Sequence, residues 1–345
     1  MENYNQNFDT ERQGQPKIPF HPFFDPEGYK EKLAVRRAGN TIGLPLCLYF
    51  VGSLILQIIL TLVLTAISGL YNTQLLLSDS NVLFVINAVM SLVLFTAPFV
   101  CVASASKYRP SELLVFNKVN KTRAAAVIML GLGVCILSNI GTALLSNIIN
   151  TVFNVQVSDN MPEFNSGWHS FLLMTLCIGI IPALVEEFAF RGIVLGVLRK
   201  HVSDGVAIVV SATFFGLVHG NFQQIPFAFG VGLVLGYATV YTGSMFPAII
   251  IHAINNTMSV ILSYTTATMS PMVMAAVFYL YYAVMLLFGL CGFILLTKTE
   301  IAPFRLSAER SENTKRNLKW ICTTPTMIIY AFICVISAVA ALFIM

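Results

Sequence analysis

The sequence predicts an all-α protein, a polytopic membrane helical bundle of about eight to nine transmembrane helices. Three observations lead to this prediction. The chain of 345 residues is 57% hydrophobic, and its mean hydropathy is +0.78. Only 10% of its residues are charged, whereas about 25% are charged in soluble domains. Its apolar residues form runs that are long enough to cross about 30 Å of hydrocarbon.

Nine apolar runs are candidate spans. They cover residues 42–66, 82–105, 124–148, 170–198, 206–220, 226–242, 246–264, 272–296 and 323–344. The fifth to seventh runs are short or rich in glycine, so their boundaries are the least well defined. Small residues such as Gly230, Gly232 and Gly236 let helices approach one another closely in lipid, so we expect tight packing in this part of the chain.

The placement of basic residues tests the number of spans. Lys and Arg form four clusters, with six residues before 41, five in 107–123, two at 199–200 and six in 298–319. Nine spans and a cytosolic N-terminus place all four clusters on the cytosolic side, as the positive-inside rule requires. The opposite loops, near Asp79 and residues 159–163, contain acids and no Lys or Arg. We therefore expect an integral membrane protein with a cytosolic N-terminus, in the plasma membrane of a bacterium.

One predicted helix carries charges in its middle. Residues 181–199 read IPALVEEFAFRGIVLGVLR, and a charge at the centre of a membrane helix costs about 2.5–3.5 kcal/mol. Glu187 and Arg191 are four residues apart, which places them on one helix face as an ion pair. Glu186 is rotated by about 100° from that pair. One glutamate can therefore be neutralised by the arginine while the other is free for another role.

Two further apolar stretches carry polar side chains at helical spacing. Phe215 and His219 are four residues apart in SATFFGLVHG, and His252 and Asn256 are four residues apart in FPAIIIHAINNT, so each pair shares a helix face. Polar residues inside a membrane face a bundle interior or a water-filled cavity. We therefore expect one polar site, wetted by a cavity that opens to the cytosol. Its predicted members are Glu186, Glu187, Arg191, His219, His252 and Asn256.

The chemistry open to this set of side chains is narrow. A carboxylate and an imidazole can hold and deprotonate a water molecule, while a second imidazole and a carboxamide can donate hydrogen bonds to an oxyanion. Alternatively, Glu186, His219 and His252 bind Zn²⁺ and the metal activates the water. No HExxH motif is present. The cofactor is therefore either zinc or none, and both alternatives are open.

The motifs resemble those of a known family. EEFAFR at 186–191 fits EExxxR, FGLVH at 215–219 fits FxxxH and HAINN at 252–256 fits HxxxN. Their order and separation resemble the CPBP family of intramembrane proteases, the CAAX-protease and bacteriocin-processing (Abi) group. The resemblance implies that Glu186 and His219 activate water, while His252 and Asn256 stabilise the oxyanion. Members have been described both as metalloproteases and as metal-free glutamate proteases.

With this resemblance, the chain divides into four expected regions. Residues 1–40 form a polar cytosolic tail, and residues 41–150 form N-terminal transmembrane helices. Residues 167–262 form a catalytic core similar to that of CPBP proteases. Residues 263–345 form C-terminal transmembrane helices with a basic cytosolic loop at 298–319.

The function hypothesis is an intramembrane endopeptidase that hydrolyses a CaaX-like, bacteriocin-type or membrane-anchored peptide. Its expected partners are a peptide or membrane-protein substrate and the lipid bilayer, with no nucleic acid. The main alternative is a non-catalytic membrane scaffold, or an immunity or regulatory protein, that keeps the same fold. A proton-coupled transporter would also use intramembrane Glu and His residues, but the two halves show no convincing internal repeat of the kind common in transporters.

Overall fold

The computed structural model describes residues 25–68, 79–106, 108–153, 167–221, 224–299, 306 and 313–344. Within these residues the regular elements are helices, and the only β-type pairing is one isolated bridge between Phe116 and Ser244. The helices are α1 Pro26–Ser68, α3 Ser80–Ala105, α4 Pro110–Leu113, α5 Lys121–Phe153, α6 Trp168–Met174, η1 Thr175–Ile180, α7 Ile181–Glu187, η2 Phe188–Val194, α8 Leu195–Leu198, α9 Asp204–Leu217, α10 Gln224–Thr242, α11 Phe246–Thr268, α12 Pro271–Thr299, α13 Thr314–Cys322 and α14 Pro325–Ile344. The predicted all-α membrane bundle is confirmed.

The number of spans lies at the lower end of the expected range. Among the described residues, 7 helices are long and apolar enough to cross a membrane, or 8 if the bent pair α13–α14 is one span. When the bent pair is counted for the predicted span 323–344, the remaining difference from nine is α9, predicted as a span over 206–220, which has only 14 residues. At 1.5 Å per residue, such a helix is about 21 Å long. That is shorter than the roughly 30 Å hydrocarbon core.

Helix α1 begins before the predicted end of the polar tail. We expected a tail over residues 1–40, but the helix starts at Pro26 and continues to Ser68. The side chain of Asp25 accepts a hydrogen bond from the Glu27 N–H, and proline suits the first helical turn because its missing N–H has no intrahelical partner there. The part of the predicted tail from residue 26 onward is therefore helical and continuous with the first span. Residues 1–24 lie outside the described part of the chain.

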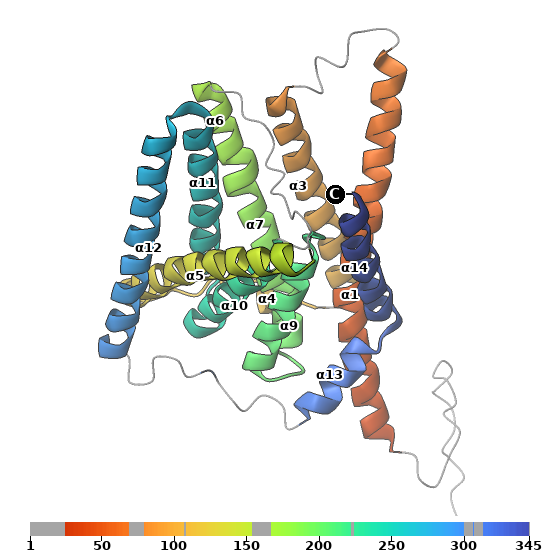
Figure 1. Ribbon diagram of the computed structural model, residues 1–345. Coiled ribbons are helices and arrows are strands. Elements are labelled where there is room, and N and C mark those ends of the chain that lie inside the picture. Colours follow the sequence, from red (N-terminus) through yellow and green to blue (C-terminus); the bar gives the residue numbers. More distant parts are fainter. Residues whose placement is uncertain are drawn as a thin grey trace, which may run out of the picture.

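Most of the long helices stand upright beside one another, and α5 crosses them at a steep angle (Figure 1). Helix α5 packs on α10 and α12, while α1 packs on α3 and α14. Where α5 meets α12, a Cβ atom added to Gly133 would lie 2.5 Å from the Cα atom of Gly289. In lipid, helix association depends on such close packing, because surrounding acyl chains remove the hydrophobic driving force.

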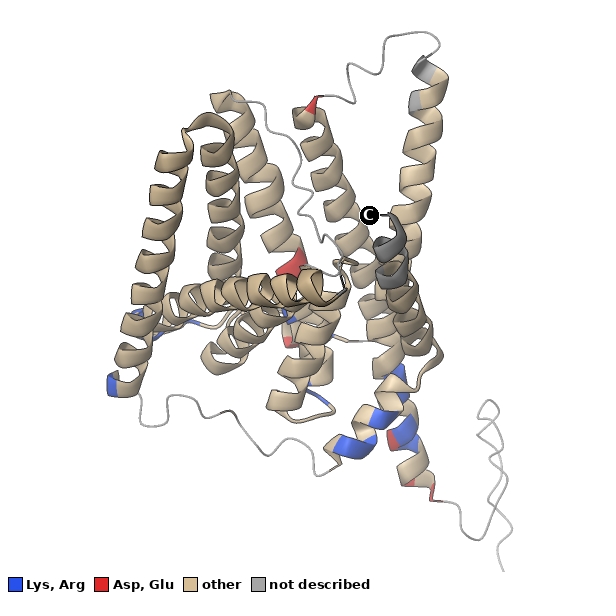
Figure 2. Cartoon of the chain, in the orientation of Figure 1, with Lys and Arg blue, Asp and Glu red and all other residues tan. Residues whose placement is uncertain are grey.

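Figure 2 shows that most of the described Lys and Arg residues gather at one end of the bundle, while a few lie near the start of α5. The residues at that end belong to the start of α1, to α13, to the end of α12 and to the turn just after α8, and we call this side the basic end. Arg191 is an exception because it lies in the interior near Glu186 and Glu187. Segregation of basic residues to one end fits the positive-inside rule. That this end faces the cytosol stays a prediction.

A cluster of buried aromatic rings fixes the helix that carries the two glutamates. The ring centroid of Phe190 lies 6.1 Å from that of Phe95, 6.3 Å from that of Phe99 and 5.1 Å from that of Phe215. All four side chains are buried. Such aromatic pairs each contribute about 0.5–1.5 kcal/mol beyond the burial of their area. Phe190 is therefore held between α3 and α9, which sets the position of the charged residues beside it.

Candidate active site

The charged stretch forms a continuous but irregular helix. The α-helical turns of α7 are flanked by two π-helical segments, η1 before them and η2 after them. At the end of η2, the Leu195 N–H donates to the carbonyl of Phe190 five residues earlier, and the Ser211 hydroxyl of α9 donates to the same carbonyl over 3.2 Å. Such π-helical turns are rare and occur frequently at functional sites. The irregular turns border both sides of the glutamate pair.

The predicted ion pair between Glu187 and Arg191 is confirmed. Arg191 Nη1 donates to Glu187 Oε1 over 2.9 Å, and both side chains have 0% exposure. Arg191 Nη2 also donates to the carbonyl of Gly232 over 3.2 Å, and its guanidinium carbon lies 4.4 Å from the centroid of the Phe215 ring. A Cβ atom at Gly232 would meet Ala212 at 3.0 Å. The glycine therefore lets α10 approach closely enough for its carbonyl to bind the arginine.

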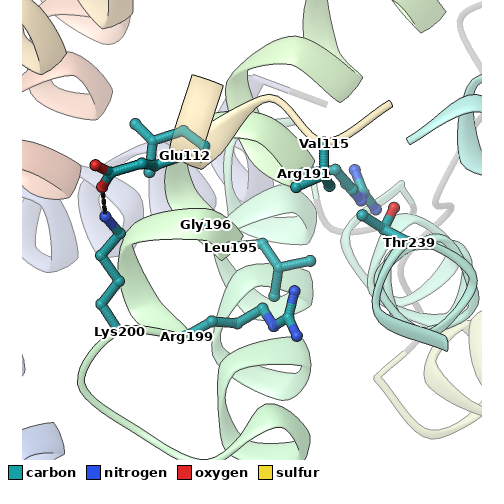
Figure 3. Close-up of a pocket in the computed structure, with 9 residues that line it drawn as sticks. Glu112, Val115, Arg191, Leu195, Gly196, Arg199, Lys200 and Thr239 are labelled. Carbon is teal, nitrogen blue, oxygen red and sulfur yellow. Dashed lines mark hydrogen bonds and ion pairs between the residues drawn. The ribbon is translucent and has the colours of Figure 1, made fainter. Parts of the chain in front are cut away.

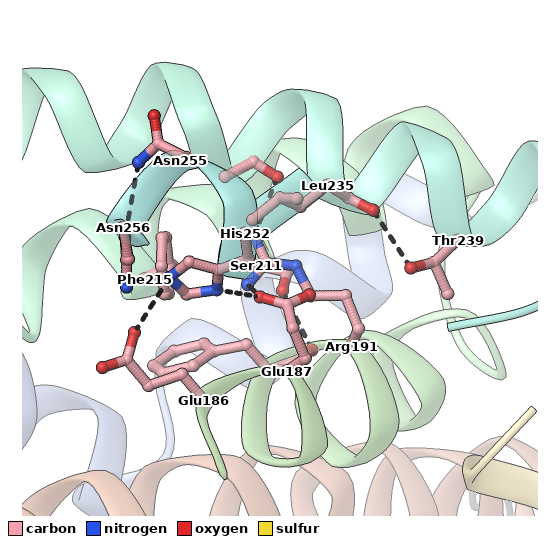
Figure 4. Close-up of polar contacts among 12 residues, drawn as sticks. Glu186, Glu187, Arg191, Ser211, Phe215, Leu235, Thr239, His252, Asn255 and Asn256 are labelled. Atoms are coloured by element: carbon pink, nitrogen blue, oxygen red, sulfur yellow. Dashed lines mark hydrogen bonds and ion pairs between the residues drawn. The ribbon is translucent and has the colours of Figure 1, made fainter. Parts of the chain in front are cut away.

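Glu187 also binds His252, a contact that the sequence did not predict. His252 Nδ1 lies 2.8 Å from Glu187 Oε1, and Figure 4 shows the imidazole lying between the two glutamates. An ionised carboxylate can only accept a hydrogen bond, so Nδ1 carries the hydrogen. Glu186 forms no hydrogen bond to any described residue, and its Oε2 lies 3.8 Å from His252 Nε2. Glu187 Oε1 therefore binds both Arg191 and His252. Glu187 Oε2 is buried without a hydrogen-bond partner among the described residues, and Glu186 has only the longer contact with His252.

Both imidazoles contact the ring of Phe215. The centroid of that ring lies 5.2 Å from the centroid of His219 and 5.6 Å from that of His252. His219 Nδ1 lies 2.8 Å from the backbone carbonyl of Phe215. Because a carbonyl only accepts, Nδ1 carries the hydrogen in His219 as well. Each histidine is thus held through Nδ1, and Nε2 is the nitrogen left for chemistry.

Asn256 lies one turn beyond His252 on α11, as predicted, but its amide is engaged elsewhere. Its Nδ2 donates to the carbonyl of Ile178 over 3.4 Å, and its Oδ1 accepts from Asn255 Nδ2 over 3.3 Å. Pro182 has no N–H with which to bond the Ile178 carbonyl in the α-helical manner. Asn256 therefore supports the irregular helix segment, and it can donate to a substrate only by exchanging this long hydrogen bond.

The expected metal ligands do not converge. No three His, Cys, Asp or Glu side chains in the described residues are placed to hold a metal ion. Among the predicted ligands Glu186, His219 and His252, both histidines have Nδ1 engaged, which leaves Nε2 as the nitrogen that would bind a metal ion. A catalytic zinc ion takes three protein ligands at about 2.0–2.2 Å. The present arrangement of side chains does not fit that geometry.

The structure contains a cavity at the basic end, but it does not join the predicted site residues. It has a volume of about 370 Å³ and is lined by Arg191, whereas neither Glu186 nor His252 lines it. We had expected one cytosolic cavity to wet both of those residues. Arg191 instead lines this cavity. Glu187 binds both Arg191 and His252, so it connects the cavity lining to His252.

Comparisons with known proteins match the part of the chain that carries the site. Residues 168–258 match the family model described as type II CAAX prenyl endopeptidase Rce1-like. Over 107 residues the chain is 31% identical to the membrane-embedded CAAX protease MroQ of Staphylococcus aureus (strain USA300), a match that covers 29% of this chain and 43% of that relative. No solved structure matches the chain. The resemblance predicted from the three motifs is confirmed for this segment.

Proposed function

We propose that the protein is an intramembrane endopeptidase that hydrolyses a peptide bond in a membrane-embedded peptide or protein. The observation that carries this proposal is the unequal engagement of two adjacent glutamates. Glu187 is buried and hydrogen-bonded to Arg191 and His252, whereas Glu186 is 13% exposed at its side chain and has only a 3.8 Å contact with His252. The Rce1-like match over residues 168–258 supports the same reaction class.

Glu186 is the general base in this proposal. Its carboxylate removes a proton from a water molecule that also donates to Nε2 of His219. The water oxygen bonds to the carbonyl carbon of the substrate peptide, and the carbonyl π electrons move onto oxygen. His219 is suited to positioning the water, because its Nδ1 hydrogen bond to the Phe215 carbonyl leaves Nε2 as an acceptor. The product of this step is a tetrahedral intermediate with a negatively charged oxygen.

His252 and Asn256 stabilise that oxyanion. With hydrogen on both ring nitrogens, His252 donates from Nδ1 to the Glu187 carboxylate over 2.8 Å and from Nε2 to the oxyanion. Asn256 Nδ2 adds a second donor once it releases the Ile178 carbonyl. The C–N bond then breaks as the proton held by Glu186 moves to the leaving nitrogen. The elements of one water molecule are thereby added across the peptide bond.

The substrate class follows from the position of the site within apolar helices. A CaaX-like, bacteriocin-type or membrane-anchored peptide would reach Glu186 with its scissile bond at membrane depth. The chain matches less than half the length of its MroQ relative. We therefore propose the substrate from the site alone. The immediate prediction is that cleavage occurs near an apolar segment.

The test is hydrolysis by the purified full-length protein in liposomes, supplied with a library of membrane-inserting peptides in ¹⁸O-labelled water. Mass spectrometry of the products should show new carboxyl groups that carry one ¹⁸O atom. Glu186→Gln, which keeps the size of the side chain and removes its basicity, should give no product. If the wild-type protein and this variant gave the same product pattern, Glu186 would not be the base. If neither cleaved any peptide, the non-catalytic scaffold would be favoured.

A further inference from the structure

The cavity at the basic end lies apart from the proposed catalytic residues. Its volume of about 370 Å³ is enclosed by the end of the site-bearing helix, by α4 and the residues just after it, and by α10. This volume is within the range of about 300–1,000 Å³ that is typical of small-molecule sites. The lining residues are Glu112, Leu113, Val115, Arg191, Leu195, Gly196, Arg199, Lys200 and Thr239 (Figure 3).

Cationic side chains outnumber acidic ones in this lining. Three cations, Arg191, Arg199 and Lys200, contribute to the wall, and Glu112 is the one acid among the lining residues. Lys200 bonds to Glu112 at one edge of the cavity (Figure 3), and this contact lowers the pKa of Glu112. The Lys200 and Glu112 side chains are 33% and 44% exposed. Pairs exposed to this degree contribute at most about 1 kcal/mol, so a stronger anion can displace Glu112.

The cations keep donors that their protein partners do not use. Arg199 donates through Nε and Nη2 to Asp204, and its Nη1 has no partner among the described residues. The Lys200 ammonium has three hydrogens, and Glu112 is its one hydrogen-bond partner in the described chain. Arg191 is buried, and its Nε atom has no hydrogen-bond partner in the part of the chain that the structure describes. The spare donors of Arg199 and Lys200, which are adjacent in the chain and partly exposed, suit a ligand with several negatively charged oxygens.

We propose that this cavity binds the phosphate group of an anionic ligand, in the first instance the headgroup of an anionic phospholipid. Lys200 and Arg199 would donate to the phosphate oxygens, while Leu113, Val115 and Leu195 would contact the apolar part of the ligand. The cavity lies at the basic end, where anionic headgroups of the bilayer are attracted to Lys and Arg residues. A soluble phosphate compound carries the same group, so the experiment below separates the two sources.

Occupancy of the cavity is coupled to the catalytic residues through one side chain. Arg191 lines the cavity and also binds Glu187, the carboxylate that holds His252. A negative charge beside Arg191 would weaken its interaction with Glu187. An effect of the ligand on peptide hydrolysis therefore rests on the proposed function. Binding of the ligand to the cavity does not depend on the proposed function, so the experiment measures binding.

The test uses full-length protein in nanodiscs of phosphatidylcholine, with or without phosphatidylglycerol. Native mass spectrometry counts the bound phosphatidylglycerol, and the thermal midpoint reports stabilisation. The wild-type protein should retain the anionic lipid and unfold at a higher temperature in its presence. Lys200→Gln should lower the affinity about tenfold, the effect of losing one charge-assisted contact of about 1.4 kcal/mol. Glu112→Gln should raise it, because the competing carboxylate is removed.

Lys319→Gln is the matched control. It removes one exposed basic charge from α13, which is also at the basic end, and should leave binding unchanged. Equal losses of phosphatidylglycerol affinity in Lys200→Gln and Lys319→Gln would overturn the proposal, because binding would then depend on the general surface charge. An absence of stabilisation by both phosphatidylglycerol and inorganic phosphate would also overturn it. Inorganic phosphate added to phosphatidylcholine nanodiscs tests the other source. Stabilisation by phosphate that Lys200→Gln abolishes would support the phosphate site and assign it to a soluble ligand.

Discussion

Replacing Arg191 by methionine tests whether the buried ion pair holds the site together. The substitution introduces an apolar side chain of similar length and removes two hydrogen bonds, one to Glu187 and one to the Gly232 carbonyl. It also removes a cation–π contact with Phe215 at 4.4 Å. Removing one partner of a buried pair costs about 3–5 kcal/mol. Because His252 Nδ1 still contacts the Glu187 carboxylate in this variant, we expect a loss at the lower end of that range, about 3 kcal/mol in unfolding free energy.

Unfolding by SDS in mixed micelles, followed by circular dichroism, measures this loss. Arg316→Met is the matched control because it breaks an ion pair with Glu31 in which both side chains are 41% exposed. Such exposed pairs contribute at most about 1 kcal/mol. The double variant Glu187→Gln/Arg191→Met should lose less stability than Arg191→Met alone, since no unpaired charge stays buried. A loss in Arg191→Met as small as that in Arg316→Met would refute the reasoning.

Three further predictions follow from the site and the packing. Asn256→Ala should lower the single-turnover rate of peptide hydrolysis about 10²–10³-fold if its amide is an oxyanion donor; an unchanged rate would limit it to a structural role. Gly289→Ala should lower the unfolding free energy by about 1–3 kcal/mol through overpacking, because its Cβ would lie 2.8 Å from Gly133 Cα. Gly141→Ala is the control, because a Cβ atom added at Gly141 has no neighbouring atom within 4 Å. Chelation should leave hydrolysis intact; loss of activity that Zn²⁺ restores would contradict the metal-free proposal.

The parts of the site that could be predicted from sequence are those set within a single helix. Glu187 and Arg191 are four residues apart, and the cost of burying either charge alone in lipid made their pairing the expected outcome. The contact of Phe215 with His219 follows from the same spacing. The separate role of Glu186 was predictable because a neighbouring residue on a helix points about 100° away.

Contacts between helices were beyond prediction because they depend on how the helices pack. Nothing in the spacing of His252 indicates that its Nδ1 meets the same oxygen of Glu187 that Arg191 binds. The π-helical turns had only Pro182 as a local signal, and their hydrogen bonds depend on Ser211 and Asn256 from other helices. The short length of α9 and the early start of α1 likewise reflect local capping and packing, which hydropathy does not resolve.

The most direct test of the proposed site compares two isosteric variants of adjacent residues, Glu186→Gln and Glu187→Gln, in one preparation. For each variant, the rate of hydrolysis of the best peptide substrate and the thermal midpoint are measured together. Glu186→Gln should lose hydrolysis and keep the wild-type midpoint, because Glu186 makes no hydrogen bond to the described residues. Glu187→Gln should lower both, because it weakens the contacts with Arg191 and His252. Hydrolysis at the wild-type rate in Glu186→Gln, or a fall in its midpoint equal to that of Glu187→Gln, would contradict this division of roles.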